Sequence, residues 1–177
     1  MKFASEATIE ILEKALGREE ETRDFYRGCL AKSNVDGTKV ILEALIKDEE
    51  DHVAIVSEML KTAGGEGEVS NINIVASDSS RDVFDQAFPH GIAKDASSVD
   101  ESETVSDMLK KALKNEKESH DNYAYAAEHT EEKDARKLFR KLAHEEKKHF
   151  ILIDNLINYL DDPGTWLYSE ENDLFNL

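Results

Sequence analysis

The sequence predicts an all-α protein: a four-helix bundle of two repeated antiparallel helical hairpins joined by a long crossover connection. The only two prolines, Pro89 and Pro163, lie outside the long stretches rich in Glu, Lys, Leu and Ala. Apolar residues recur three and four positions apart in four of these stretches, as they do in amphipathic helices. In addition, Ile11 to Leu60 aligns without a gap with Met108 to Ile157, which indicates a duplicated hairpin.

The first hairpin is expected over residues 5–62, with helices at roughly 5–32 and 36–62. Ser33 stands where the N-cap of its second helix is expected. The core-facing stripes of the two helices contain Ile9, Leu12, Leu16, Leu42, Leu45, Val56 and Met59.

Residues 63–102 differ in composition and form the crossover connector, which is rich in Gly, Asn and Ser. A structureless loop of this length is uncommon inside a compact domain. The connector is therefore expected to contribute to the fold. One short amphipathic segment, with Val83, Phe84, Ala87 and Phe88, is predicted to lie against the bundle.

The second hairpin is expected over residues 103–160, with helices at roughly 103–129 and 131–160 and Thr130 as an N-cap. The tail, residues 161–177, contains enough apolar side chains to pack on the domain or on a partner subunit. Together these elements predict a single domain over residues 1–177.

Charge and cysteine content exclude several classes of protein. Acidic residues outnumber basic ones by 39 to 22, so the net charge of −17 repels nucleic acid and anionic membrane surfaces, and neither is expected as a partner. The single cysteine, Cys29, excludes an intrachain disulfide and a four-cysteine metal site. The opening residues do not resemble a signal peptide, and a cytoplasmic location is expected.

Two Glu-x-x-His pairs interrupt the apolar stripes of the second helix in each hairpin. They are Glu49 with His52 and Glu146 with His149. Because residues three apart face the same side of a helix, each pair can bind one metal ion through both side chains. One such pair is common on a charged helix surface, whereas two in matching positions on core stripes indicate a buried site.

The first helix of each hairpin places one carboxylate on its core stripe. Glu19 lies as far before Asn34, at the first turn, as Glu49 lies after it, so the two reach the same height in an antiparallel hairpin. Glu116 and Glu146 are placed in the same way about Glu131. The predicted ligands are Glu19, Glu49, His52, Glu116, Glu146 and His149.

Charge balance predicts that this site binds two metal ions. Buried carboxylates without partners cost several kcal/mol each, and four together also repel one another. Two divalent cations would neutralise the four glutamates. Carboxylate and imidazole ligands suit iron or manganese, and the arrangement matches the general motif of di-iron and di-manganese bundles. We expect two iron ions per chain, with manganese or a mixed pair as the alternative.

Four further residues are expected near the ligands without binding metal. Tyr26 and Tyr123 occupy matching positions on the core stripes, as core aromatics or as hydrogen-bond partners of the site. Arg23 and His120 lie four residues after the first-helix glutamates and are better suited to contact ligands than to be ligands.

At these residues the sequence resembles the rubrerythrin-like branch of the ferritin-like superfamily, over both hairpins. Rubrerythrins pair a helix carrying Glu, followed seven residues later by Tyr, with a helix carrying Glu-x-x-His. In the first half this is Glu19 and Tyr26 with Glu49 and His52, and the second half repeats it.

The resemblance implies a role for each ligand and for the site. It implies that Glu49 and Glu146 bridge the metals, that Glu19 and Glu116 are terminal ligands, and that His52 and His149 each bind one iron. It also implies reduction of hydrogen peroxide by the reduced site, with oxygen as a poorer oxidant.

Two departures from the rubrerythrin pattern are visible. Rubrerythrins carry a rubredoxin-like site with four cysteines, which this chain, with Cys29 alone, lacks, so an external electron donor such as rubredoxin is expected. They also carry an extra Glu three residues after the third-helix ligand, where this chain has Ser119. Glu118 lies about 100° away around the helix and cannot take its place.

Three functions compete at the level of the sequence. The leading one is an enzyme, a di-iron oxidoreductase of the peroxidase kind that acts as a homodimer. The second is a ferroxidase that stores iron in a shell of many subunits. The third is a bundle whose metal is purely structural. The size of the assembly separates the first from the second.

Overall fold

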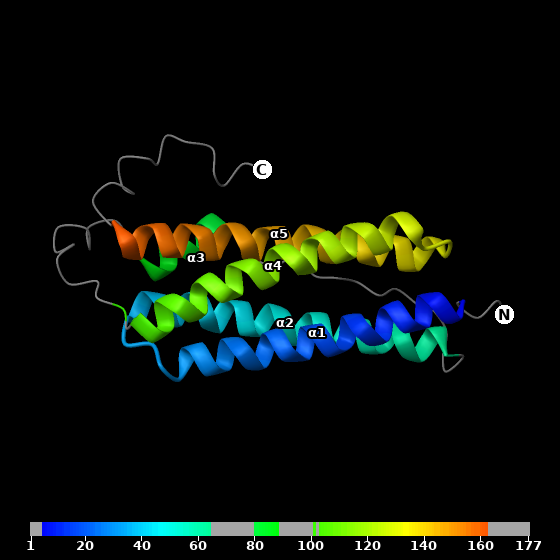
Figure 1. The fold of residues 1–177 in the computed structure, drawn as a ribbon, viewed down its shortest axis with the longest axis horizontal. Helices are drawn as coiled ribbons and strands as arrows, with labels where there is room; N and C mark the ends of the chain where they lie inside the picture. Colours follow the sequence, from blue (N-terminus) through cyan, green and yellow to red (C-terminus); the bar gives the residue numbers. More distant parts are fainter. Residues whose placement is uncertain (1–4, 65–79, 89–100, 102, 163–177) are drawn as a thin grey trace.

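The computed structural model describes residues 5–64, 80–88, 101 and 103–162, and these residues form helices without any strand. The helices are α1 (Glu6–Leu30), α2 (Asp36–Ala63), α3 (Ser80–Ala87), α4 (Glu103–His129) and α5 (Lys133–Asp161) (Figure 1). The predicted all-α bundle is confirmed. Residues 163–177 of the predicted tail and most of the connector lie outside the described residues.

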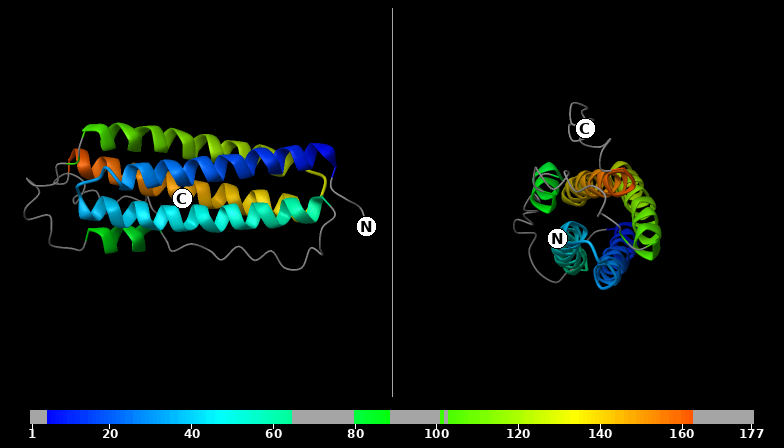
Figure 2. Two further views of the ribbon diagram at one scale, coloured as in Figure 1. Left: turned by 90° about the horizontal axis from the view of Figure 1, so that it is seen from below. Right: turned by 90° about the vertical axis from the view of Figure 1, so that its left-hand side faces the viewer.

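The four long helices run side by side as two antiparallel hairpins, α1 with α2 and α4 with α5 (Figures 1 and 2). The end of α2 and the start of α4 lie at opposite ends of the bundle, so the chain crosses its whole length between them (Figure 1). Among the described residues, no helix is long and apolar enough to cross a membrane.

Helix starts differ from the expected ones at two positions. The N-cap of α2 is Val35 and not Ser33, whose hydroxyl donates a 2.6 Å hydrogen bond to Glu101. The N-cap of α5 is Glu132 and not Thr130, which is buried. Both predicted caps are wrong: the Ser33 hydroxyl bonds to the other hairpin, the buried Thr130 hydroxyl makes no capping hydrogen bond, and each helix begins two or more residues later.

A glutamate at each end of the bundle joins the two hairpins. At one end Glu132 accepts hydrogen bonds from the Ser5 backbone at 2.8 Å and from the Thr8 hydroxyl at 2.9 Å. At the other end Glu101 accepts from Ser33 and from the Asn34 backbone, at 2.6 and 3.2 Å. These contacts fix the height of one hairpin against the other, and so the alignment of the side chains at mid-height.

The amphipathic segment predicted within the connector is α3, which packs against α2 and α5. Val83, Phe84 and Ala87 are buried, and the Phe84 ring meets Tyr159 edge to face at 5.6 Å. Gly37 allows this close approach, because a Cβ atom there would clash with the Phe88 ring. The prediction that this segment lies on the bundle is confirmed.

Two apolar clusters fill the bundle and leave a polar layer between them. One cluster includes Leu42, Leu45, Phe84, Leu109, Ile153 and Leu156. The other includes Leu12, Val56, Met59, Phe139 and Leu142. Along α2 the first cluster ends at Leu45 and the second begins at Val56, so Glu49 and His52 lie in the layer between them. The core thus encloses the predicted ligands on both sides.

Candidate metal centre

The structure brings all six predicted ligands together in the polar layer. α1 contributes one glutamate, α4 another, and α2 and α5 each contribute a Glu-x-x-His pair. All six side chains are buried, with exposed fractions of 3% or less. They are Glu19, Glu49, His52, Glu116, Glu146 and His149.

The six side chains form two overlapping groups that share two glutamates. In each group the ligand atoms lie within 4.8 Å of one another. One group consists of Glu19, Glu49, His52 and Glu146, and the other of Glu49, Glu116, Glu146 and His149. Glu49 and Glu146 belong to both groups, as two bridging ligands of a metal pair would.

Both histidines direct the same ring nitrogen toward the carboxylates. His52 Nδ1 lies 3.1 Å from Glu146, 3.4 Å from Glu19 and 3.6 Å from Glu49. His149 Nδ1 lies 3.1 Å from Glu49 and 3.9 Å from Glu146. The two rings stack with their centroids 5.5 Å apart. Each half of the site therefore has one imidazole facing the shared pair of glutamates.

Two tyrosines hold the glutamates of the opposite hairpin. The Tyr26 hydroxyl on α1 donates a hydrogen bond to Glu116 on α4, and the Tyr123 hydroxyl on α4 donates one to Glu19 on α1. These exchanged contacts follow the sequence repeat. They fix the orientation of each carboxylate and leave its second oxygen to face a histidine.

Arg23 and His120 were expected beside the ligands, but their contacts are with other residues. The Arg23 guanidinium forms a 3.0 Å ion pair with neighbouring Asp24, and His120 Nδ1 lies 2.7 Å from the Ala143 carbonyl oxygen. Both side chains are only half-buried, because Thr22 and Ser119, one position earlier on each helix, occupy the buried face. The structure therefore does not bring these two residues to the site.

Sequence reasoning missed Asp48, which lies behind His149. Its carboxylate is 3.4 Å from His149 Nε2, on the side of the ring opposite the ligand-facing Nδ1. A carboxylate in this position commonly orients a metal-binding imidazole and raises its basicity. Its place immediately before Glu49 was the only signal in the sequence, and it does not identify a partner 101 residues away.

A sequence profile of the rubrerythrin family matches residues 10–157, which include all six ligands and both tyrosines. The chain belongs to the rubrerythrin family. No curated protein and no solved structure matches it. Membership supports the interpretation of the buried carboxylate and histidine cluster as a di-iron site.

Without metal, the pKa values of the buried glutamates are shifted by burial and by one another's charge. Burial, followed by the charge of Glu49, raises the pKa of Glu19 to about 8. Burial and three neighbouring carboxylates raise the pKa of Glu146 as well. Burial would also raise the pKa of Glu49, but the close imidazoles of His149 and His52 outweigh it and hold that pKa low. The site therefore binds protons where the family binds metal.

The donor atoms fit a pair of metal ions. Several buried atoms find no hydrogen-bond partner among the described residues: both oxygens of Glu49, one oxygen each of Glu116 and Glu146, and Nδ1 of His52 and His149. Buried polar atoms are rarely left in this state. Two divalent cations would satisfy these atoms and balance the four carboxylates, with neutral imidazoles as ligands.

The metal-free protein is expected to lose stability as the pH rises from about 5 to about 8. A glutamate in the unfolded chain loses its proton near its ordinary pKa of 4.5, whereas Glu19 in the folded protein keeps it up to a pKa of about 8. The pKa values of His52 and His149 are also raised, because the carboxylates around each imidazole outweigh burial. Over this range the folded state binds more protons than the unfolded state, so the free energy of unfolding falls with pH.

Thermal unfolding of chelator-treated protein between pH 5 and pH 8 measures this effect, at most about 1.4 kcal/mol per pH unit for each proton. Glu19→Gln should flatten the dependence, because glutamine does not titrate. Metal-loaded protein should also depend less on pH, since the metal replaces the protons. A melting temperature that rises with pH in the metal-free protein would contradict the assignment.

Proposed function

We propose that the protein is a di-iron oxidoreductase that reduces hydrogen peroxide with electrons from a separate donor. The observation that carries the proposal is the pair of overlapping ligand groups, which share Glu49 and Glu146 in the core of a rubrerythrin-family bundle. Two ferrous ions held there supply together the two electrons that one peroxide molecule needs to become two water molecules.

The residues of the chain have separate tasks in this proposal. Glu49 and Glu146 hold the two irons close together, and Glu19, Glu116, His52 and His149 complete the two halves. The hydroxyls of Tyr26 and Tyr123 orient the terminal glutamates through hydrogen bonds. The apolar clusters on both sides exclude bulk water from the ligands, which strengthens every electrostatic interaction within the layer.

Re-reduction of the irons needs a second protein in this proposal. The sequence contains one cysteine, Cys29, which is buried, and burial raises the pKa of its thiol to about 11. The chain thus has no thiolate cluster of its own to carry electrons to the site. A rubredoxin or another small one-electron carrier would deliver two electrons per peroxide.

Anaerobically purified protein is expected to contain about two iron ions per chain. Metal analysis together with the optical spectrum of the oxidised protein measures this, and size-exclusion mass should correspond to a homodimer. A large multi-subunit shell that accumulates many iron ions per chain would favour ferroxidase and storage instead. A single redox-inert metal, retained on oxidation, would favour a structural role.

A further inference from the structure

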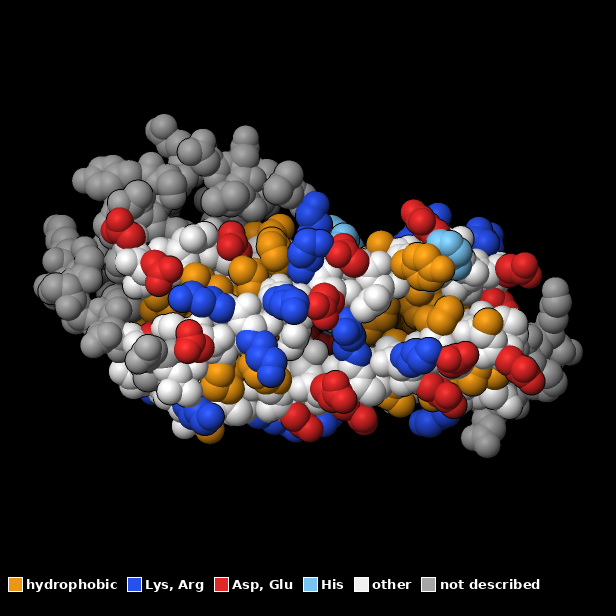
Figure 3. Space-filling view, in the orientation of Figure 1, with side chains coloured by type: hydrophobic (Ala, Val, Ile, Leu, Met, Phe, Trp, Pro, Cys, Tyr) orange, Lys and Arg blue, Asp and Glu red, His pale blue; other side chains and the backbone are white. Residues whose placement is uncertain are grey.

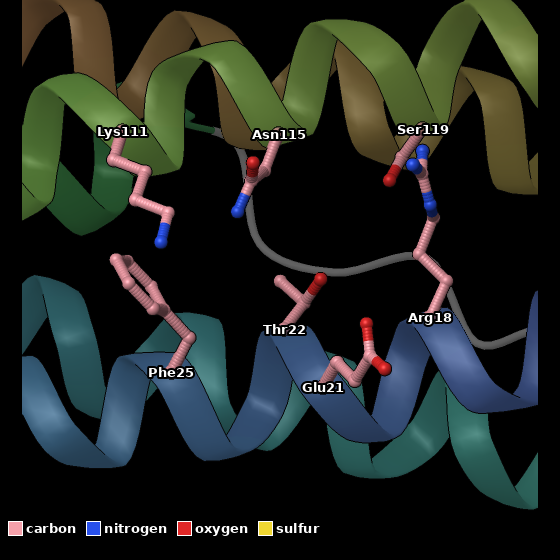
Figure 4. A pocket seen from close by; sticks show the side chains of 7 residues that line it. All are labelled: Arg18, Glu21, Thr22, Phe25, Lys111, Asn115 and Ser119. Carbon is pink, nitrogen blue, oxygen red and sulfur yellow. The ribbon is translucent and has the colours of Figure 1, made fainter.

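A polar cavity of about 300 Å³ lies between α1 and α4 (Figure 4). Thr22 and Ser119 line it, and both are buried. Thr22 lies three residues after Glu19, and Ser119 three residues after Glu116, so each is one turn along the same helix face. The cavity therefore adjoins the metal centre on the side formed by α1 and α4.

The cavity is lined mainly by hydrogen-bond donors. Arg18 and Lys111 bring two positive charges, and Asn115 adds an amide to the two hydroxyls. Glu21 is the single carboxylate of the lining. Basic side chains also lie over the middle of this face, among acidic ones (Figure 3). In a chain of net charge −17, a cavity with two cations and one anion is a local exception.

Neither cation of the cavity has a carboxylate within hydrogen-bond distance among the described residues. Arg18 Nη1 is buried and finds no hydrogen-bond partner there. Its Nη2 lies 3.6 Å from Glu118, which is longer than a hydrogen bond. Lys111 lies over the Phe25 ring, 5.4 Å from its centroid, and forms no ion pair with a described residue. Both groups can accept an anionic ligand without losing a strong partner.

We propose that this cavity binds a small oxyanion. Arg18 and Lys111 lie at its two ends and attract the anion by their charge, while Thr22, Asn115 and Ser119 offer hydrogen-bond donors along it (Figure 4). The planar guanidinium is suited to paired oxygen acceptors. Liquid water occupies about 30 Å³ per molecule, so a cavity of about 300 Å³ has room for a short carboxylic acid or an inorganic oxyanion. This binding site goes beyond the proposed function, because it does not involve the oxidant or the electron donor.

Metal loading should strengthen oxyanion binding. Glu116 lies one helical turn from the cavity, and its carboxylate opposes an anion when no metal is present. Divalent cations neutralise the cluster and remove that repulsion. The comparison of metal-free protein with protein loaded with zinc, which has no redox chemistry, therefore belongs in the test.

The test is a nuclear magnetic resonance titration of amide-labelled protein, with and without zinc, at constant ionic strength. Sodium acetate and sodium sulfate are the probes, and acetamide is the neutral control. We expect saturable shifts at residues 18–25 and 111–119 with an oxyanion and none with acetamide. Response to acetate alone would identify a carboxylate site, and response to both a general oxyanion site.

Two variants and a matched control decide the assignment. Arg18→Gln and Lys111→Gln should each weaken binding by at least about tenfold, because each removes one of the two positive charges that attract the anion. Lys117→Gln should leave it unchanged, because Lys117 is on the same helix but exposed and paired with Asp121. Lys111 is exposed, so its variant should fold even if the Arg18 variant does not.

Two results would overturn the proposal: no saturable shift in either form of the protein, or equal affinity in the Lys111 variant and the original chain. Zinc uptake, measured separately by calorimetry, tests the metal centre itself. Protein that takes up no zinc would contradict the proposed function, and the titration of its metal-free form would still decide whether the cavity binds oxyanions.

Discussion

Replacement of both Glu49 and Glu146 by alanine is expected to abolish binding of the metal pair. These two carboxylates belong to both ligand groups, so the double variant leaves each half with one glutamate and one histidine. The two ions would lose their shared ligands and half of the negative charge that balances them. Iron content after anaerobic reconstitution should fall from about two ions per chain to nearly none.

A double variant on the exposed side of the same helix is the matched control. Glu43→Ala with Glu58→Ala removes two carboxylates from α2, and both side chains face solvent. Iron content should stay at the level of the original chain, and circular dichroism should show equal helix content in all three proteins. Full iron content in the Glu49 and Glu146 variant would show that these residues do not bridge the metals.

Helical periodicity was enough to predict the bundle and the height of the ligands. The two hairpins bring Glu19 and Glu49 to one level because the residue count on both sides of the turn is equal. Burial of all six ligands followed from their place on apolar stripes. Local spacing thus specifies a site whose members lie as far apart in the sequence as Glu19 and His149.

Contacts between the two hairpins could not be predicted from the sequence in the same way. Asp48 and His149 meet only because α2 and α5 pack together, and the spacing within one helix does not show which residues meet across that interface. The same applies to Ser33, whose hydroxyl binds Glu101 and does not cap α2. The cavity between α1 and α4 also depends on how far apart two helices lie at a given height.

The di-ferrous protein is expected to react with hydrogen peroxide at least about tenfold faster than with oxygen, a difference of about 1.4 kcal/mol in activation free energy. The physical reason is that two ferrous ions supply the number of electrons that one peroxide molecule accepts. Two ferrous ions, one peroxide and two protons give two ferric ions and two water molecules, so a single encounter completes the reaction. Oxygen accepts four electrons on its way to water, and one pair of irons supplies only half of them.

Stopped-flow oxidation of the anaerobic reduced protein by each oxidant measures the two rates. Steady-state peroxide consumption is then compared with and without rubredoxin and its reductase. Turnover should require both, because one cysteine, Cys29, cannot form a rubredoxin-like site. The Glu49→Ala, Glu146→Ala double variant is the control for peroxide consumption by free iron.

Oxidation by oxygen at an equal or higher rate, with a ferric mineral growing as ferrous iron is added, would contradict the peroxidase proposal. Ferroxidase and storage would then account better for a metal pair in this bundle, because storage needs repeated oxidation of incoming iron and no electron donor.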